Sequence, residues 1–332
     1  MTQKIAAALS RSEMAAFFPG SLSEELFSLT GPEGLFDPNQ EGANWPYFLK
    51  QLRPAALVSH WSTPRLPDDA ADYLNYVAHV TGAVRNILPR EFLERGVRVT
   101  NWGDGAAETV AEGTLMLILS ALRQTQHWGR EMHERAGWRC NFGDGRTLFE
   151  RHVAIHGFGR IARALVKLLV PFRVRVSAYS EGVPHDFIRQ HGVEPLPSLE
   201  ALFGCGADIL AELEALTPRS RFSVREEHLR ALREGAVFVN TGRGSVVDEA
   251  ALVQIATEGW LRIALDVYDV EPVLPDSPLR GPAHVTLMPH VSGPTPDCFP
   301  SIGRATLDNL HRWKNGEPLH SEVTPAAYDI ST

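Results

Sequence analysis

The chain has 332 residues, of which 44% are hydrophobic and 22% charged, and a formal net charge of −8 at pH 7. This length predicts roughly two domains, each large enough to bury its own core. The negative charge argues against general affinity for nucleic acid or anionic membranes, because both need a basic protein surface. The apolar patch at 5–9 is too short for the core of a signal peptide, and no apolar run reaches the length of a membrane span.

The cysteines and histidines favour a reduced protein without a metal site. Cys140, Cys205 and Cys298 are widely spaced, form no CxxC pair and leave an odd thiol. Such cysteines are typical of reduced thiols in a cytoplasmic protein. The 13 histidines show no metal-ligand spacing, and the sequence has no short-period repeat. We therefore expect a cytoplasmic protein that holds no metal.

Apolar segments alternate with helical ones in the N-terminal part. We expect strands at 4–9, 55–59, 76–80 and 97–100, a short helix at 12–18 and a loop at 31–45. This alternation indicates a parallel α/β unit. The unit lacks a glycine pattern for binding phosphate. A long helix, apolar all round and so expected to be buried, follows it at 107–124.

A glycine-rich turn organises the rest of the chain. A buried strand is expected from Val153 to His156, and a helix from Ala162 onward. Between them, Gly157 and Gly159 make a tight turn. This pattern is the fingerprint of a dinucleotide-binding βαβ unit, in which the helix N-terminus receives the pyrophosphate. Flavin enzymes, methyltransferases and simple tight turns carry the same pattern, so alone it leaves the ligand open.

Further strand and helix signals follow this turn. We expect strands at 174–179, 207–210, 236–240, 261–267 and 284–287, and helices at 224–233, 248–259 and 300–315. Ser223 and Asp248 are expected to cap the first two of these helices. Gly235 and Gly259 are expected to close them.

Three polar residues come directly after three of these strands. Arg243, Glu271 and His290 each lie just beyond the carboxyl end of an expected strand, as the glycine turn does. In open parallel sheets, ligands bind beyond the carboxyl ends of the strands, near the point where the strand order reverses. We therefore expect the three side chains and a cofactor to face one cleft.

The chemistry of these residues fits hydride transfer between a nicotinamide and a 2-hydroxy acid. The guanidinium of Arg243 suits bidentate binding of the substrate carboxylate. The reaction also needs an acid/base group that titrates near neutrality, for which His290 is the candidate, while Glu271 would hold its tautomer and favour the imidazolium. Each residue alone is more typical of a turn, a structural position or a solvated loop, so it is their joint placement that favours catalysis.

The ordered motifs resemble those of the D-isomer-specific 2-hydroxyacid dehydrogenases, the family of phosphoglycerate, glycerate (hydroxypyruvate reductase-like), formate and D-lactate dehydrogenases. The matching stretches are Thr-Val-Ala-Glu (109–112), Gly-Phe-Gly-Arg-Ile-Ala (157–162), Val-Asn-Thr-Gly-Arg-Gly-Ser-Val-Val-Asp-Glu-Ala-Ala-Leu (239–252), Ala-Leu-Asp-Val-Tyr-Asp-Val-Glu-Pro (264–272) and Pro-His-Val-Ser-Gly-Pro-Thr (289–295). Several motifs in order are far more specific than one glycine loop.

The resemblance implies an α/β fold with two Rossmann-like domains built on parallel sheets. A flavodoxin-like substrate domain would comprise 1–101 and 295–332, and a Rossmann domain that binds NAD(P) would comprise 102–294. The resemblance further implies a homodimer that acts on a small 2-hydroxy or 2-keto acid. It implies NAD as the cofactor, with NADP as the alternative.

The resemblance also assigns roles to individual residues. It implies that Arg243, Glu271 and His290 are catalytic. The cofactor-binding residues that it implies are Gly157, Gly159, Arg160, Ile161, Ala162, Ser180, Thr217, Thr241, Gly242, Asp266 and Gly293. The substrate-binding residues that it implies are Thr81, Gly82, Ala83, Arg243 and His290.

Some positions depart from the family pattern. Where the family commonly has an acid that binds the adenosine ribose, this chain has Ser180, followed by Glu181. Loss of that acid admits a 2′-phosphate, but Glu181 would repel one, so we favour NAD over NADP. The family's His-Leu-Pro-Leu-Thr-like loop is Leu-Glu-Ala-Leu-Thr at 213–217. The usual aspartate after Gly82 is missing, and an atypical substrate pocket shaped by Trp61 and Trp102 is expected.

Two other classes of function stay open at this point. Some relatives act as corepressors with the same fold, so an NAD(H)-sensing binding protein with little turnover is the main alternative. A methyltransferase would share the glycine loop but would leave the three polar residues unexplained. The particular 2-hydroxy acid is not given by the sequence, and glyoxylate, hydroxypyruvate and larger 2-keto acids are all open.

Overall fold

The structure, a computed structural model, describes residues 3–138 and 144–330. The chain divides into two units: unit 1 consists of Met1–Ala106 and Pro294–Thr332, and unit 2 of Ala107–Gly293. The predicted boundaries, 101/102 and 294/295, fall near these ends, and the functions expected of the two domains stay predictions. Cys140 lies outside the described residues.

Unit 1 is built on a five-stranded parallel sheet with the order β2-β1-β3-β4-β5. Its strands are β1 (Ile5–Ala8), β2 (Leu35–Phe36), β3 (Ala56–Ser59), β4 (Tyr76–His79) and β5 (Arg98–Thr100). The order 2-1-3-4-5 is that of flavodoxin-like folds, as predicted. Strand β2 lies in the stretch that we expected to be a loop. Two residues are too few to show a strand period in a sequence.

Helices cover both faces of this sheet. They are α1 (Arg11–Phe17), α2 (Ser21–Thr30), α3 (Trp45–Leu52), α4 (Glu91–Glu94), α12 (Phe299–Asn315) and α13 (Pro325–Ile330). Side chains of β1 alternate between two cores, because successive residues of a strand point to opposite faces. Ala6 and Ala8 share a core with residues of α3 and α4, whereas Ile5 and Ala7 pack with residues of α1, α2 and α12. Unit 1 therefore needs a helix from near the end of the chain to close its second face.

Unit 2 is built on a seven-stranded parallel sheet with the order β12-β11-β10-β9-β6-β7-β8. Its strands are β6 (His152–His156), β7 (Arg175–Tyr179), β8 (Glu194–Pro195), β9 (Ile209–Glu212), β10 (Val237–Asn240), β11 (Arg262–Leu265) and β12 (Val285–Leu287). This is the Rossmann order with one further strand, and it reverses between β6 and β9. The predicted fold class is confirmed for both units.

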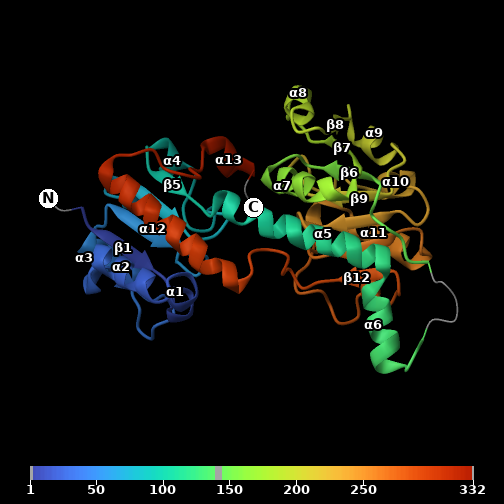
Figure 1. Cartoon of the computed structure of the whole chain (residues 1–332). Helices are drawn as coiled ribbons and strands as arrows, with labels where there is room; N and C mark the ends of the chain where they lie inside the picture. The colour runs from blue at the N-terminus through green and yellow to red at the C-terminus, as the bar shows by residue number, and fades with distance from the viewer. Residues whose placement is uncertain (1–2, 139–143, 331–332) are drawn as a thin grey trace. The chain divides into compact units, whose positions relative to one another are not determined.

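Helices lie on both faces of the sheet of unit 2, and α6 extends away from it (Figure 1). The helices are α5 (Ala107–Arg123), α6 (Thr125–Glu134), α7 (Arg160–Leu169), α8 (His185–Arg189), α9 (Leu199–Phe203), α10 (Glu226–Ala231) and α11 (Glu249–Glu258). Residues of α5 and α7 form one core with the sheet, and residues of α9, α10 and α11 form the other. In the described part of the chain, none of the helices is long and apolar enough to cross a membrane.

One predicted helix cap is wrong and another is confirmed. Helix α10 begins at Glu226 with Arg225 at its N-cap, not at Ser223. The predicted first residue, Val224, instead donates its N–H to the Val246 carbonyl, so the backbone there is bridged to another segment. Asp248 caps α11 as expected, accepting the N–H groups of Ala250 and Ala251, and Gly259 ends that helix in the left-handed conformation.

Candidate active site

The glycine turn after β6 leaves the N-terminus of α7 open. Gly157 has a φ of +87°, and a Cβ there would lie 2.5 Å from the backbone nitrogen of Glu214, so only glycine fits. Gly159 is the N-cap of α7, and no side chain caps this end. Ala162, in the first turn of α7, is fully buried in the core beneath it. Helix N–H groups at such a turn favour an anion such as a pyrophosphate.

The loop after β10 carries Arg243 and is held from both sides. The Asn240 side chain accepts the N–H of Gly242 at 3.0 Å and donates to the Arg243 carbonyl at 3.2 Å. A Cβ on Gly244 would lie 1.9 Å from the carbonyl carbon of Tyr268, so glycine is required where this loop packs against the loop after β11. Arg243 is therefore fixed relative to the loop that carries Glu271.

Glu271 and His290 meet at the same edge of the sheet. Nδ1 of His290 donates to Oε2 of Glu271 at 2.7 Å, and the other carboxylate oxygen accepts the N–H of Tyr268 at 3.0 Å. His290 has a φ of +57°, an uncommon backbone conformation for a residue other than glycine. Its side chain is half exposed and that of Glu271 about one third exposed. The pair is thus ordered internally and still reaches solvent.

The carboxylate of Glu271 affects the pKa of Arg243. Burial lowers the pKa of the Arg243 guanidinium, and the carboxylate of Glu271 opposes that shift. Arg243, Glu271 and His290 follow β10, β11 and β12, so the structure brings all three to one carboxyl edge.

Asp266 sets the position of the loop that carries His290. Its buried carboxylate accepts the N–H of Val291 at 2.8 Å and that of Ser292 at 2.9 Å. Backbone donors therefore engage both oxygens of Asp266. Its implied position beside the nicotinamide stays a prediction.

The other predicted cofactor residues lie at the carboxyl edge or in the first turn of α7. Thr241 is hydrogen-bonded to Thr114 of α5 at 2.7 Å, and Thr217 shares a tight turn with Ser220. Of the remaining ones, Arg160 and Ile161 begin α7 and Gly293 closes unit 2, all exposed or partly buried, whereas Ser180, which follows β7, is buried.

Three ionisable residues at this edge were not predicted from the sequence. His156 ends β6, Glu212 ends β9, and the two are paired across the sheet with Nδ1 and Oε2 2.7 Å apart. Glu214 follows in the same loop, and its Oε2 lies 3.9 Å from Nε2 of His156. The signal was the presence of ionisable residues within two apolar strands. We expected the strand to end at 210, which hid Glu212.

The predicted substrate residues Thr81, Gly82 and Ala83 belong to unit 1, in the loop after β4. A Cβ on Gly82 would lie 2.9 Å from the indole of Trp102. That indole packs edge-on against Trp61 with ring centroids 5.6 Å apart. The two tryptophans thus stand together at the carboxyl edge of the first sheet.

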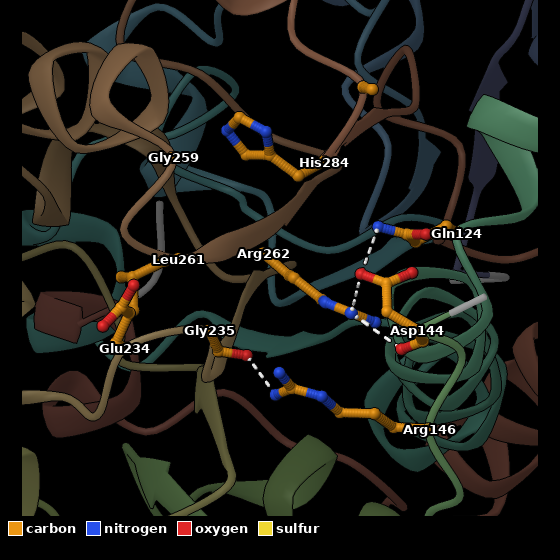
Figure 2. A pocket seen from close by; sticks show the side chains of 10 residues that line it. Gln124, Asp144, Arg146, Glu234, Gly235, Gly259, Leu261, Arg262 and His284 are labelled. Carbon is orange, nitrogen blue, oxygen red and sulfur yellow. Dashed lines mark hydrogen bonds and ion pairs between the residues drawn. The ribbon is translucent and has the colours of Figure 1, made fainter.

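A polar pocket of about 440 Å³ lies at the opposite edge of the sheet in unit 2 (Figure 2). Figure 2 shows Arg262 directed at Asp144, with Nη2 and Oδ2 2.6 Å apart, and Arg146 directed at the Gly235 carbonyl. Its lining residues include Gly235, Arg262 and His284, which lie at the amino ends of β10, β11 and β12. This pocket is therefore separate from the edge that carries His290.

Comparisons with known proteins agree with this arrangement. The NAD binding domain of the D-isomer specific 2-hydroxyacid dehydrogenases matches residues 115–292. A glyoxylate reductase of Korarchaeum cryptofilum is 32% identical over 268 residues, which cover 79% of this chain and 80% of the relative. A D-3-phosphoglycerate dehydrogenase of Mycobacterium tuberculosis is 32% identical over 249 residues, covering 75% of this chain and 46% of the relative.

Solved structures show the same fold. A glyoxylate reductase from Paecilomyes thermophila superposes with a TM-score of 0.77 at 23% identity, covering 97% of this chain and 99% of that one. The D-mandelate dehydrogenase of Rhodotorula graminis gives 0.79 at 21% identity, with 96% and 97% covered.

The parallel sheets, the open glycine turn and the match to the NAD binding domain define a nucleotide-dependent oxidoreductase. The chain belongs to the D-isomer specific 2-hydroxyacid dehydrogenase family. It is a 2-hydroxyacid dehydrogenase that uses NAD or NADP.

Proposed function

We propose that this enzyme interconverts a D-2-hydroxy acid and its 2-keto acid, with His290 as the acid and base and Arg243 holding the substrate carboxylate. The 2.7 Å hydrogen bond between His290 and Glu271 is the observation that carries this proposal. A histidine alone in a loop has many uses. A histidine oriented by a carboxylate at the ligand-binding edge of a Rossmann sheet has the geometry of a general acid and base.

The hydrogen bond supports Nε2 as the nitrogen that exchanges the proton with the substrate. Because Nδ1 of His290 donates to Glu271, Nε2 is the nitrogen that faces the reacting oxygen. In reduction, protonated Nε2 donates its proton to the keto oxygen as charge develops there. In oxidation, neutral Nε2 accepts the hydroxyl proton. The negative charge of Glu271 stabilises the imidazolium in both directions.

Arg243 would bind the substrate through its guanidinium. A fork of N–H donors matches a carboxylate next to the reacting carbon, and bidentate binding fixes the orientation of that carbon. Burial of Arg243 strengthens such an ion pair, since less water competes for it. The backbone at 81–83 of unit 1 is the further substrate contact that we propose.

The cofactor would lie along the carboxyl edge of unit 2. The nicotinamide supplies or accepts the hydride when bound. The turn at Gly157 and Gly159 would receive the pyrophosphate at the N-terminus of α7. Asp266, Thr241, Gly242 and the other predicted residues at this edge would contact the remainder of the dinucleotide.

The test is an assay of 2-keto acid reduction, followed by loss of NADH or NADPH absorbance, in wild type, His290→Gln and Arg243→Ala. We expect both variants to lose activity by about 10²-fold or more, with dinucleotide affinity kept within about threefold. His284→Gln, a histidine at the opposite edge of the sheet, is the matched control and should keep its activity. Full turnover in both site variants would exclude these roles.

Glyoxylate is the first substrate to test, because several relatives are named glyoxylate reductases. Hydroxypyruvate and larger 2-keto acids complete the screen. Tight NADH binding without turnover on any of them would favour the corepressor-like alternative.

We also propose a homodimer in the cytoplasm, as the family resemblance implies. The free thiols of Cys205 and Cys298 fit a reducing compartment. Light scattering coupled to size exclusion measures the oligomeric state, and a monomer at micromolar concentration would contradict the proposed homodimer.

A further inference from the structure

The carboxyl end of β7 is where a Rossmann fold recognises the ribose of the adenosine. An Asp or Glu there usually accepts a hydrogen bond from the 2′-hydroxyl and discriminates against a 2′-phosphate. In this chain the strand ends at Tyr179, and the next residue, Ser180, is nearly buried. The carboxylate expected at this point is therefore missing from the strand itself.

A carboxylate reaches the same point from a different loop. The hydroxyl of Ser180 donates to Oε2 of Glu214 at 2.9 Å. Glu214 lies in the loop after β9, which is the neighbour of β6 across the switch point. Two residues separated by 34 positions thus combine a hydroxyl and a carboxylate at the end of β7.

The backbone of Glu214 is pressed against the glycine turn. Leu213 donates its N–H to the His156 carbonyl at 2.8 Å, and Gly157 donates to Tyr179 at 2.8 Å. The space that a Cβ of Gly157 would need is filled by the backbone of Glu214. Glu214 therefore spans the distance from the proposed pyrophosphate turn to the end of β7. In a dinucleotide the adenosine ribose is attached directly to the pyrophosphate. A dinucleotide whose pyrophosphate lies at the glycine turn would therefore have its adenosine ribose next to Glu214.

His156 and Ser180 oppose the effect of burial on Glu214. Burial raises the pKa of Glu214 above its ordinary value, and the charge of His156 and the hydrogen bond from Ser180 offset only part of that shift. Burial lowers the pKa of His156, but Glu212 and, more weakly, Glu214 outweigh it and leave that pKa raised. The cluster thus holds two carboxyl groups and one imidazole. Among the described residues, no group of three or more His, Cys, Asp or Glu side chains has the arrangement of a metal site.

Glu214 is the member of this cluster that a ligand can reach. The side chain of Glu212 is fully buried, whereas that of Glu214 is 17% exposed. Its two oxygens accept from Ser180 and from the N–H of Ala215. A carboxylate accepts about four hydrogen bonds, so acceptor capacity is left for ribose hydroxyls.

We propose that Glu214, positioned by Ser180, recognises the 2′-hydroxyl of the adenosine ribose and makes the enzyme prefer NADH over NADPH. This inference rests on the proposed function, since it assigns a residue to the dinucleotide of that reaction. A 2′-phosphate would meet the Glu214 carboxylate and the exposed Glu181 next to Ser180, and like charges there repel. The opposite preference would come from Arg219, which pairs with Glu181 at 3.0 Å and would have to release it to bind a 2′-phosphate.

The test compares the dissociation constants of NADH and NADPH, measured by fluorescence titration. In wild type we expect NADH to bind at least about tenfold more tightly than NADPH. In Glu214→Gln the NADH affinity should fall about tenfold or more while the NADPH affinity holds or rises. Glu234→Gln, the matched loss of an exposed carboxylate at the opposite edge of the sheet, should change the ratio by less than about threefold.

Two further variants separate recognition from folding. Ser180→Ala removes the donor that positions Glu214 without changing charge, and should weaken NADH more than NADPH. Adding Ser180→Asp to Glu214→Gln returns a carboxylate to the strand end and should restore the NADH preference.

Three outcomes would overturn the assignment: wild type preferring NADPH, a ratio unchanged in Glu214→Gln and Ser180→Ala, or no rescue by Ser180→Asp. If wild type reduces a 2-keto acid but the ratio of the NADH and NADPH dissociation constants is the same in Glu214→Gln, only this inference fails. If wild type binds neither nucleotide, the proposed function fails with it.

Discussion

Both units are doubly wound parallel sheets, and in both a helix starts directly after a strand at the carboxyl edge. In unit 1 that helix, α1, closes its own N-terminus with a capping box. Ser10 accepts the N–H of Glu13, and Glu13 accepts the N–H of Ser10 at 2.7 Å. In unit 2 the corresponding helix, α7, has Gly159 at its N-cap and no side-chain cap. The same architectural position therefore carries a self-capped helix in unit 1 and, in unit 2, an uncapped helix end at which we propose an anion site.

Each unit also has a Glu–His pair at its carboxyl edge, and the two pairs differ in burial. Glu13 Oε1 lies 2.6 Å from His60 Nδ1, and both side chains are 14% exposed. Ser62 and the Ser10 N–H bind the other oxygen of Glu13. The Glu271–His290 pair is more exposed, and the Glu271 carboxylate acts on the guanidinium of Arg243. Because both units contain a Glu–His pair, the pair alone does not identify an active site. We propose catalysis only for the pair that a ligand can reach and that lies near a guanidinium.

The largest effect is expected from Gly157→Ala. The new Cβ would lie 2.5 Å from the Glu214 backbone at a φ of +87°, so we expect a loss of about 3 kcal/mol of stability and of dinucleotide binding. Gly159→Ala is the matched control, because nothing lies within 4 Å of its Cβ. Thermal unfolding measures the stability of both variants, and NADH titration measures binding by Gly157→Ala. An equal loss of stability in the two variants would contradict the packing argument.

Glu271→Gln should show that the Glu271–His290 pair acts on turnover and not on stability. Loss of the charge that favours the imidazolium is expected to lower kcat about a hundredfold with little change in unfolding temperature. Steady-state kinetics with the 2-keto acid and NADH gives kcat, and thermal unfolding gives the unfolding temperature. An unchanged kcat would place Glu271 outside catalysis.

Glu13→Gln should act on stability instead, by about 2 kcal/mol at pH 7. Burial alone raises the pKa of Glu13, but the contact with His60 and the hydrogen bonds from Ser62 and Ser10 outweigh it and lower the pKa to about 2. Because the folded pKa lies below the usual 4.5, the stabilisation is present above pH 4.5 and is lost as the pH falls towards 2. Urea unfolding at pH 7 and pH 3 measures it, and a variant as stable as wild type at pH 7 would refute it.

The smallest effect is expected from exchanging the two helix ends. Gly159→Ser gives α7 a cap residue like that of α1 and should change stability by only a few tenths of a kcal/mol while weakening NADH binding. Ser10→Ala removes the cap of α1 and should cost about 1 kcal/mol without affecting NADH binding. Weaker NADH binding in Ser10→Ala but not in Gly159→Ser would contradict the assignment of the open helix end to unit 2.

The sequence predicted the elements that carry strong local signals. Apolar strands followed by glycine or by a single polar residue identified the sheet edges, because parallel strands place their carboxyl ends together. Strands β2 and β8 have two residues each and carry no periodic signal. Helix α2 begins after Gly20 without a side-chain cap, so its start also lacked the usual marker.

The cluster behind Glu214 could not be predicted for a different reason. The pairing of His156 with Glu212 depends on the register between β6 and β9, which are separated by a crossover. The bond between Ser180 and Glu214 depends on the path of a loop. Contacts of this kind have no short-range pattern, so only the tertiary structure reveals that three ionisable residues share one site.

The helix α12 has a consequence for how the protein is made. Ile302, Leu307 and Leu310 of α12 fill the same core as Ile5 and Ala7 of the first strand. A ribosome synthesises the whole of unit 2 between these two segments. All strands of unit 2 are therefore synthesised before α12, which covers one face of the sheet in unit 1. Unit 1 completes its core only when α12 has emerged from the ribosome.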